Sequence, residues 1–186
     1  HFFDLPFYVS RIMALMAAGE LAEACRFLGV FSHHLGDFSE PAHYYEYEIT
    51  MLRPPPPDRV NCNSHRMIED TRSTVTQLTH QPQVLGQTPE TVLMRLEGRL
   101  RELYELTLGT IIPMLDAIYQ RDAARAGELV NPVVAGTAAI MADLLHTLYC
   151  WHHRQWTAAE SQALATCRLD LMEPSAYDLE STYGCR

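Results

Sequence analysis

Lysine is absent from this 186-residue chain, and all 14 of its basic residues are arginine. Against 23 acidic residues they leave a net charge of −9, so the chain lacks the basic surface that nucleic-acid backbone binding requires, and no nucleic-acid partner is expected. No apolar run looks long enough to cross a bilayer, which predicts no transmembrane segment. A signal peptide is also missing, although a chain that starts at His1 rather than at methionine is expected to have lost an upstream segment.

Cysteine is scarce, and no two cysteines form a Cys-x-x-Cys pair, which disfavours a thiolate zinc site. The five cysteines are Cys25, Cys62, Cys150, Cys167 and Cys185. In an oxidising compartment, late cysteines such as Cys167 and Cys185 would pin the tail through disulfides. In a reducing compartment the cysteines would be small buried apolar residues, Cys25 first among them. The odd count leaves both alternatives open, and we favour a secreted or extracellular protein.

Helical periodicity dominates what is present, and no segment shows the sustained alternation of a strand. Gly19 follows the first apolar stretch, and Thr88-Pro89-Glu90 is typical of a helix start. We therefore expect an all-α protein, a single multi-helix bundle over residues 1–153 followed by a helical and irregular tail at 154–186. The helices are expected at about 6–18, 20–37, from 64, 88–120, 132–153 and 156–167, with an extended proline-rich loop at 51–63.

Imidazoles and carboxylates recur four residues apart at two places in the chain. His33 and Asp37 form the first pair, His65 and Glu69 form the second, and His43 follows Asp37 by six residues. Because four residues make about one helical turn, both side chains of a pair face the same way. Neutral imidazole and ionised carboxylate are both ligands of zinc. If the two helices pack side by side, the pairs predict a zinc cluster between helices, where bundles build such sites.

Such a cluster would suit phosphodiester hydrolysis. Clustered dications bind a phosphate diester, lower the pKa of a water molecule and stabilise the pentacoordinate transition state, so no nucleophilic serine or cysteine is required. A single histidine on a helix is more often a packed or surface residue than a ligand. The histidines assigned to such structural roles are His34, His80, His146, His152 and His153.

These motifs resemble the zinc-dependent phospholipase C family and, more distantly, the S1/P1 nucleases. The family pattern is a His-x-Leu-Gly-Asp helix end, a short x-Pro-x-His segment and a His-x-x-x-Glu helix. The matching segments here read His33-His34-Leu35-Gly36-Asp37, Glu40-Pro41-Ala42-His43 and His65-Arg66-Met67-Ile68-Glu69. An earlier family segment, whose histidine binds zinc, is similar to His1-Phe2-Phe3-Asp4. The loop before His65 is longer and richer in proline than the family pattern.

The resemblance implies two to three bound zinc ions. The residues implied for the first zinc are His1, His33 and Asp37, and those for the second are His43, His65 and Glu69. The family's general base and part of its third zinc site lie upstream of the segment that His1-Phe2-Phe3-Asp4 resembles, so no catalytic residue is assigned. The chain is expected to be a piece of a longer enzyme; the alternatives are a derivative that has lost full activity and a true N-terminus at His1 that chelates a metal through its amine and imidazole. Glu69 favours the phospholipase branch, because the nucleases usually place aspartate there.

Three functions follow from this resemblance. The leading hypothesis is a zinc-dependent hydrolase of a phospholipid or another phosphodiester, in which Tyr44, Tyr45 and Tyr47 line the substrate entrance. The alternative is a non-catalytic structural or interaction protein that keeps the zinc-binding fold, since structural zinc contributes about 10 kcal/mol or more to folding. The third is an S1/P1-type nuclease, disfavoured by Glu69 and by the absence of a basic or glycine-rich loop.

Overall fold

The computed structural model describes residues 4–43, 53–59, 64–75, 77–154 and 167–170. Within these ranges the protein is all-α, as the sequence predicts, with two short strands. The elements in chain order are α1 (Asp4–Ala17), α2 (Leu21–Ser39), the 3-10 turns η1 (Pro41–His43) and η2 (Pro57–Arg59), α4 (Ser64–Glu69), β1 (Gln77–His80), α5 (Pro89–Tyr119), α6 (Ala123–His153) and β2 (Cys167–Asp170).

Helices α1 and α2 form a hairpin whose bounds agree with the sequence prediction. Gly19 adopts a φ of 80°, the left-handed conformation that closes α1 at little steric cost only for glycine. The next amide, from Glu20, then donates to the Leu15 carbonyl at 2.9 Å. This tight reversal turns α2 back along α1, so that Phe31 and Leu35 of α2 are buried.

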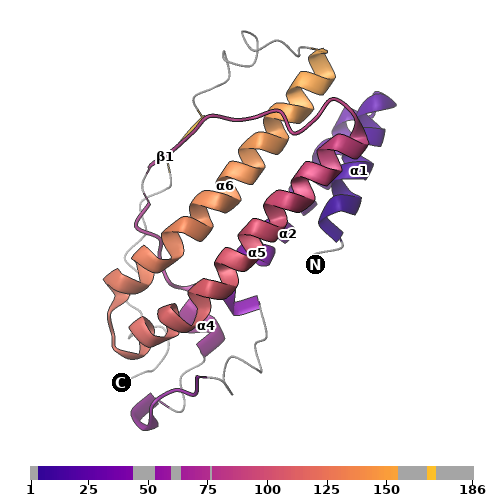
Figure 1. The fold of residues 1–186 in the computed structure, drawn as a ribbon. Coiled ribbons are helices and arrows are strands. Elements are labelled where there is room, and N and C mark those ends of the chain that lie inside the picture. The colour runs from indigo at the N-terminus through magenta and orange to yellow at the C-terminus, as the bar shows by residue number, and fades with distance from the viewer. Residues whose placement is uncertain (1–3, 44–52, 60–63, 76, 155–166, 171–186) are drawn as a thin grey trace.

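Helices α5 and α6 are the longest elements and run side by side (Figure 1). Thr88 caps α5, where its hydroxyl accepts from the Thr91 amide and the Thr91 hydroxyl accepts from the Thr88 amide. The predicted start of α6 at Pro132 is wrong, because the helix begins at Ala123 after Asp122 accepts from the Arg125 amide at 2.9 Å. A proline inside a helix lacks one amide donor, and the length of α6 on either side of Pro132 tolerates that loss.

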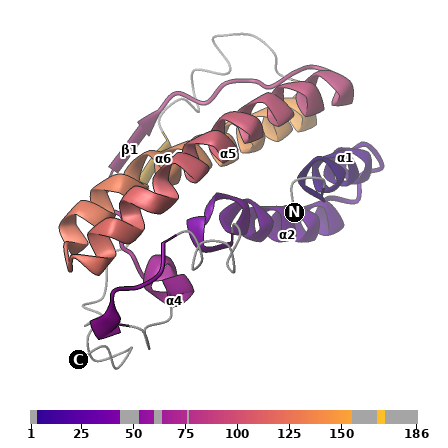
Figure 2. The same cartoon turned by 60° about the horizontal axis from the view of Figure 1, so that its bottom comes forward.

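The helices form two layers, with α1, α2 and α4 on one side of the α5/α6 pair (Figure 2). Apolar faces of both layers meet in one core, which removes their surface from water and supplies most of the folding free energy. Fully buried members of this core include Leu5, Val9, Phe31, Leu35, Ile68, Leu96, Leu100, Met114, Leu115 and Leu144. Ile68 belongs to α4, so the short helix is attached to the core through this buried side chain and the partly buried Met67 before it.

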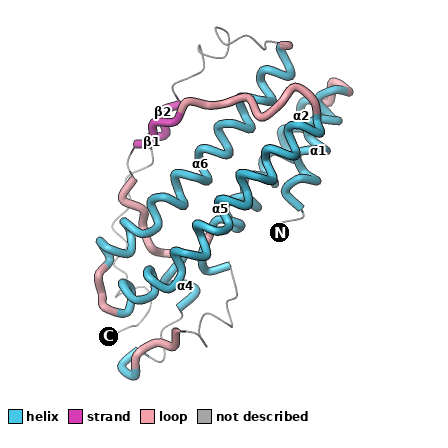
Figure 3. Tube along the Cα trace, in the orientation of Figure 1, coloured by secondary structure: helices cyan, strands magenta, loops and turns pink. Residues whose placement is uncertain are grey.

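The prediction that the chain has no strand is wrong for two four-residue segments. β1 and β2 pair antiparallel, with Gln77 opposite Asp170 and His80 opposite Cys167 (Figure 3). β2 therefore also overturns the expectation that the helical tail reaches Cys167 and that the last eighteen residues are all irregular. Residues 155–166 of the expected tail helix lie outside the described part of the chain. A strand of four residues carries too few alternating positions to be recognised from sequence alone.

Helix α6 also corrects the expectation that no segment is apolar enough to cross a membrane. By length and composition this helix would qualify. Half of its most apolar window is buried against the rest of the protein, and the core helix of a soluble protein passes the same test. The composition of α6 is thus accounted for by its place in the core beside α5.

The cysteine expectation holds for one position and is wrong for another. Cys150 is buried in α6, whereas Cys25 is exposed on α2. The adjacent Ala24 takes the buried position on that turn of α2, which directs Cys25 away from the core. The side chains of Cys62, Cys167 and Cys185 lie outside the described part of the structure.

Candidate metal centre

Three elements, α2, η1 and α4, bring the predicted ligands to one end of α2. His33 and Asp37 lie on the last two turns of α2, and the helix ends two residues after Asp37. Pro41 cannot continue the helix, and the chain turns through η1, which presents His43. His65 and Glu69 follow on one face of α4, which packs against η1. The predicted side-by-side packing of the two ligand-bearing helices is wrong, because α4 packs against η1 and α5 and not along α2; the two pairs are linked through His43.

His43, His65 and Glu69 form a compact group of metal-binding side chains. One donor atom from each lies within 4.8 Å of the other two. Nε2 of His43 is 3.2 Å from Oε1 of Glu69, and Nε2 of His65 is 3.1 Å from the same oxygen. The two imidazole rings stack with their centroids 5.3 Å apart. Among the described residues, this is the one group of three such side chains close enough to share a metal ion.

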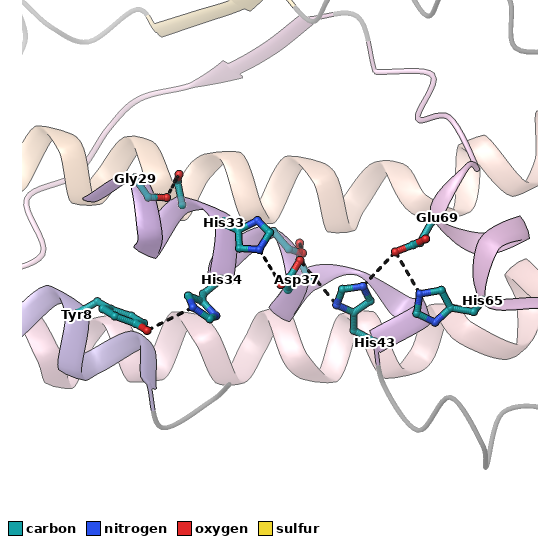
Figure 4. A network of polar contacts seen from close by, with 11 residues as sticks. Tyr8, Gly29, His33, His34, Asp37, His43, His65 and Glu69 are labelled. Atoms are coloured by element: carbon teal, nitrogen blue, oxygen red, sulfur yellow. Dashed lines mark hydrogen bonds and ion pairs between the residues drawn. The ribbon is translucent and has the colours of Figure 1, made fainter. Parts of the chain in front are cut away.

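The first predicted pair adjoins this group through His43 (Figure 4). Oδ1 of Asp37 is 3.7 Å from Nδ1 of His43, and Oδ2 of Asp37 is 3.4 Å from Nε2 of His33. Asp37 therefore faces the ring nitrogen of His43 that is opposite the one facing Glu69. At 3.7 Å this contact is longer than a hydrogen bond, so Asp37 acts on His43 as a nearby negative charge.

The charges of the group favour an ionised Glu69. Partial burial pushes the pKa of Glu69 upward, but hydrogen bonds and charges from His43 and His65 outweigh it and lower the pKa overall. The neighbouring Glu40 behaves in the opposite way. Burial raises its pKa to about 7, against lowering contributions from the Ala42 amide and the imidazoles and a further increase from Glu69. The site therefore contains one carboxylate, Glu69, that is ionised and ready to bind a cation, and a second, Glu40, whose pKa lies near neutral pH.

The donor set fits zinc. Bonds of about 2.0–2.1 Å in a tetrahedron put neighbouring ligand atoms roughly 3.3 Å apart, and both imidazole nitrogens already lie at nearly that distance from Oε1 of Glu69. The side chains are 25% exposed for His43, 23% for His65 and 42% for Glu69, so a fourth ligand can arrive from solvent. Three protein ligands with access for water distinguish catalytic zinc sites from closed structural ones.

Of the six metal ligands predicted from sequence, the structure brings three into one group and places two beside it. The ligands in the group are His43, His65 and Glu69, and those beside it are His33 and Asp37. The sixth predicted ligand, His1, lies outside the described residues. The tyrosines expected to line a substrate entrance, Tyr44, Tyr45 and Tyr47, also lie outside the described residues.

Two polar features, Glu40 and the buried Asp143, have no motif in the sequence that indicates their contacts. Glu40 was treated as the variable residue of the x-Pro-x-His segment, although an acid between two ligand motifs is a signal for electrostatic coupling. The structural role expected for His80 is confirmed, since its Nε2 is 2.7 Å from Oδ1 of Asp143. Asp143 is fully buried in α6, where an aspartate needs partners from other elements.

Comparison with known proteins adds no relative: no family model, no curated protein and no solved structure matches this chain. The resemblance to phospholipase C therefore rests on the motif residues alone. The spacing of these residues and the geometry of the group of His43, His65 and Glu69 are the observations that bear on function.

Proposed function

We propose that the protein is a zinc-dependent phosphodiester hydrolase, with phospholipid as the expected substrate. The observation that carries this proposal is the solvent-accessible group of His43, His65 and Glu69, which joins side chains from η1 and α4. Zinc at such a position would bind a phosphate oxygen and make water a nucleophile near neutral pH. The first pair, His33 and Asp37, lies beside this group and would contribute ligands to a second ion.

The residues themselves have separable tasks. His43 and His65 would present neutral Nε2 lone pairs, and ionised Glu69 would supply the negative charge that balances the cation. Asp37 would add a negative charge on the Nδ1 side of the His43 ring. The resemblance assigns no general base to a described residue, so proton removal from the nucleophile is not attributed to any of them.

The first experiment is metal content followed by hydrolysis. The full-length protein is purified, measured for zinc by elemental mass spectrometry and then assayed with bis(p-nitrophenyl) phosphate and phosphatidylcholine vesicles. We expect at least one zinc per chain in the wild type. Glu69→Ala and His65→Ala should lower zinc affinity by roughly 100-fold or more, because even outer partners of ligands typically contribute 10–100-fold. Both variants should abolish hydrolysis.

His152→Ala is the matched control, since it removes an exposed histidine at the end of α6, away from the group. It should bind zinc and hydrolyse substrate as the wild type does. The structural alternative would be favoured by two results together: the Glu69 and His65 variants lose zinc, and the wild type hydrolyses neither substrate. Wild-type protein that never binds zinc would contradict both readings.

A further inference from the structure

The segment between α4 and α5 forms a strap, defined here as residues 71–88, that runs alongside α6 (Figure 3). It begins two residues after the ligand Glu69. Its far half is held by α6 through Asp143, which accepts from the Gln83 amide at 2.8 Å, and Thr147, which accepts from the Leu85 amide at 2.8 Å. The near half, closest to the metal ligands, is held by a different residue.

That residue is Asn131, which makes three hydrogen bonds to the start of the strap. Its Oδ1 accepts from the Ser73 hydroxyl and from the Thr74 amide, both at 2.9 Å. Its Nδ2 donates to the Thr74 hydroxyl at 2.6 Å. One side chain of α6 thus supplies hydrogen bonds to two consecutive residues of an extended segment. In the described structure this segment has no partner strand at that point. We call Asn131, Ser73 and Thr74 the clamp.

Gly127, one turn before Asn131, lets the strap come close enough for the clamp to form. A Cβ atom at position 127 would lie 2.5 Å from the Arg72 carbonyl oxygen, which is far inside van der Waals contact. The backbone of the strap therefore packs directly on the backbone of α6. Residues 127 and 131 act on the same face of the helix because they are four residues apart.

Helix α4 needs such support, because it has only six residues and a helix of that length is not stable by itself. Ile68 is buried in the core and the partly buried Met67 packs against it, but these contacts hold one face of the helix and leave the position of its last turn to the segment that follows. The last turn closes through the amides of Asp70 and Thr71, which bond to the carbonyls of Arg66 and Ile68. The clamp follows two residues later and fixes where this turn can lie.

We propose that Asn131 is a positioning residue for the metal centre, which it reaches through α4 and not by contact with a ligand. The clamp holds the end of α4, and so holds His65 and Glu69 at the spacing that Nε2 of His43 requires. Because His65 and Glu69 are ordered in advance, metal binding does not have to supply the entropy that ordering them would cost. This inference rests on the proposed zinc site for its functional consequence, whereas the clamp itself can be tested in metal-free protein.

The test compares Asn131→Ala with Thr137→Val, a control in the same helix. Thr137 donates only within α6, to the Val133 carbonyl at 2.8 Å, so its substitution removes a hydrogen bond without touching the strap. Asn131→Asp is the conservative variant, because it keeps the acceptor for Ser73 and Thr74 and loses the donor. The measurements are amide hydrogen exchange by NMR in chelator-treated protein and zinc affinity by competition with a chromophoric chelator.

We expect Asn131→Ala to speed exchange of the Asp70 and Thr71 amides by roughly tenfold or more relative to amides in α5, since three hydrogen bonds restrain their turn. Zinc affinity should fall about tenfold, the low end for residues that support ligands from outside the coordination sphere. Asn131→Asp should recover part of both effects, and Thr137→Val should show neither.

Unchanged exchange at Asp70 and Thr71 in Asn131→Ala would overturn the clamp. Faster exchange with undiminished zinc affinity would overturn its link to the metal centre. Faster exchange in a protein whose wild type binds no zinc would support the clamp and contradict the proposed function instead. A purely structural role predicts that all amides accelerate together and that zinc affinity of the folded protein is unchanged.

Discussion

Replacement of Asp143 should be the most destabilising polar substitution in the described structure. Its side chain is fully buried on α6 and receives two donors at Oδ1, Nε2 of His80 at 2.7 Å and the Gln83 amide at 2.8 Å. Nη1 of Arg99 lies 2.9 Å from Oδ2, off the direction of a hydrogen bond, so this third contact is an ion pair. Asp143 therefore joins α5, α6 and the strap.

The magnitude follows from what each partner loses. Breaking a buried ion pair from one side typically costs about 3–5 kcal/mol. Arg99 is 30% exposed and His80 20%, so both can regain water, and Asp143→Ala should fall near the lower end of that range. Asp143→Asn keeps an acceptor for the Gln83 amide and removes only the charge. We expect it to cost about 1–2 kcal/mol, comparable to one charged hydrogen bond.

Equilibrium urea unfolding, followed by circular dichroism at 222 nm in metal-free protein, measures these losses. Glu102→Gln is the control, because Glu102 is 78% exposed and lies 4.0 Å from the same arginine. That exposed pair should contribute no more than about 0.5 kcal/mol. A loss below about 1 kcal/mol for Asp143→Ala, or equal losses for Asp143→Ala and Glu102→Gln, would refute the assignment of Asp143 as the junction.

Two further predictions concern pH and capping. Because burial raises the pKa of Glu40 to about 7, its neutral form stabilises the fold below the unfolded pKa of 4.5, and this contribution is lost as pH rises toward 7. Glu40→Gln should therefore match the wild type at pH 4 and exceed its unfolding free energy at pH 8 by roughly 3 kcal/mol, at about 1.4 kcal/mol per pH unit; equal pH profiles in urea titrations would contradict this. Thr88→Ala removes the acceptor for the Thr91 amide at the start of α5 and should cost about 1 kcal/mol in the same assay, whereas Thr88→Ser should cost almost nothing.

Much of the helical layout could be predicted because its signals are local. The Gly19 turn, the Thr88 cap and the apolar spacing of α2 each act within a few residues, and the structure confirms the elements they define. The strands β1 and β2 were missed for the opposite reason. Each is four residues long and is stabilised by a partner far away in the chain, so neither segment is distinctive by itself.

The candidate site divides in the same way. Spacing alone predicts that His65 and Glu69 share a face of a helix, and the structure places their donor atoms 3.1 Å apart. That His43 reaches the same oxygen depends on how η1 packs against α4, which periodicity does not determine. The motif resemblance supplied that step, while the contacts of Glu40 and Asp143 had no motif to indicate them.

The error at the start of α6 explains why the clamp was not predicted. A helix that starts at Pro132 leaves Gly127 and Asn131 in the preceding loop. In a loop, an asparagine before proline is typical of a turn. Once Asp122 caps the helix, the same two residues lie one turn apart on a continuous face. Glycine there allows close approach of the Arg72 backbone, and asparagine supplies the donor and acceptors that an extended segment needs. The cost of both residues in a helix interior is then offset by their contacts with the strap.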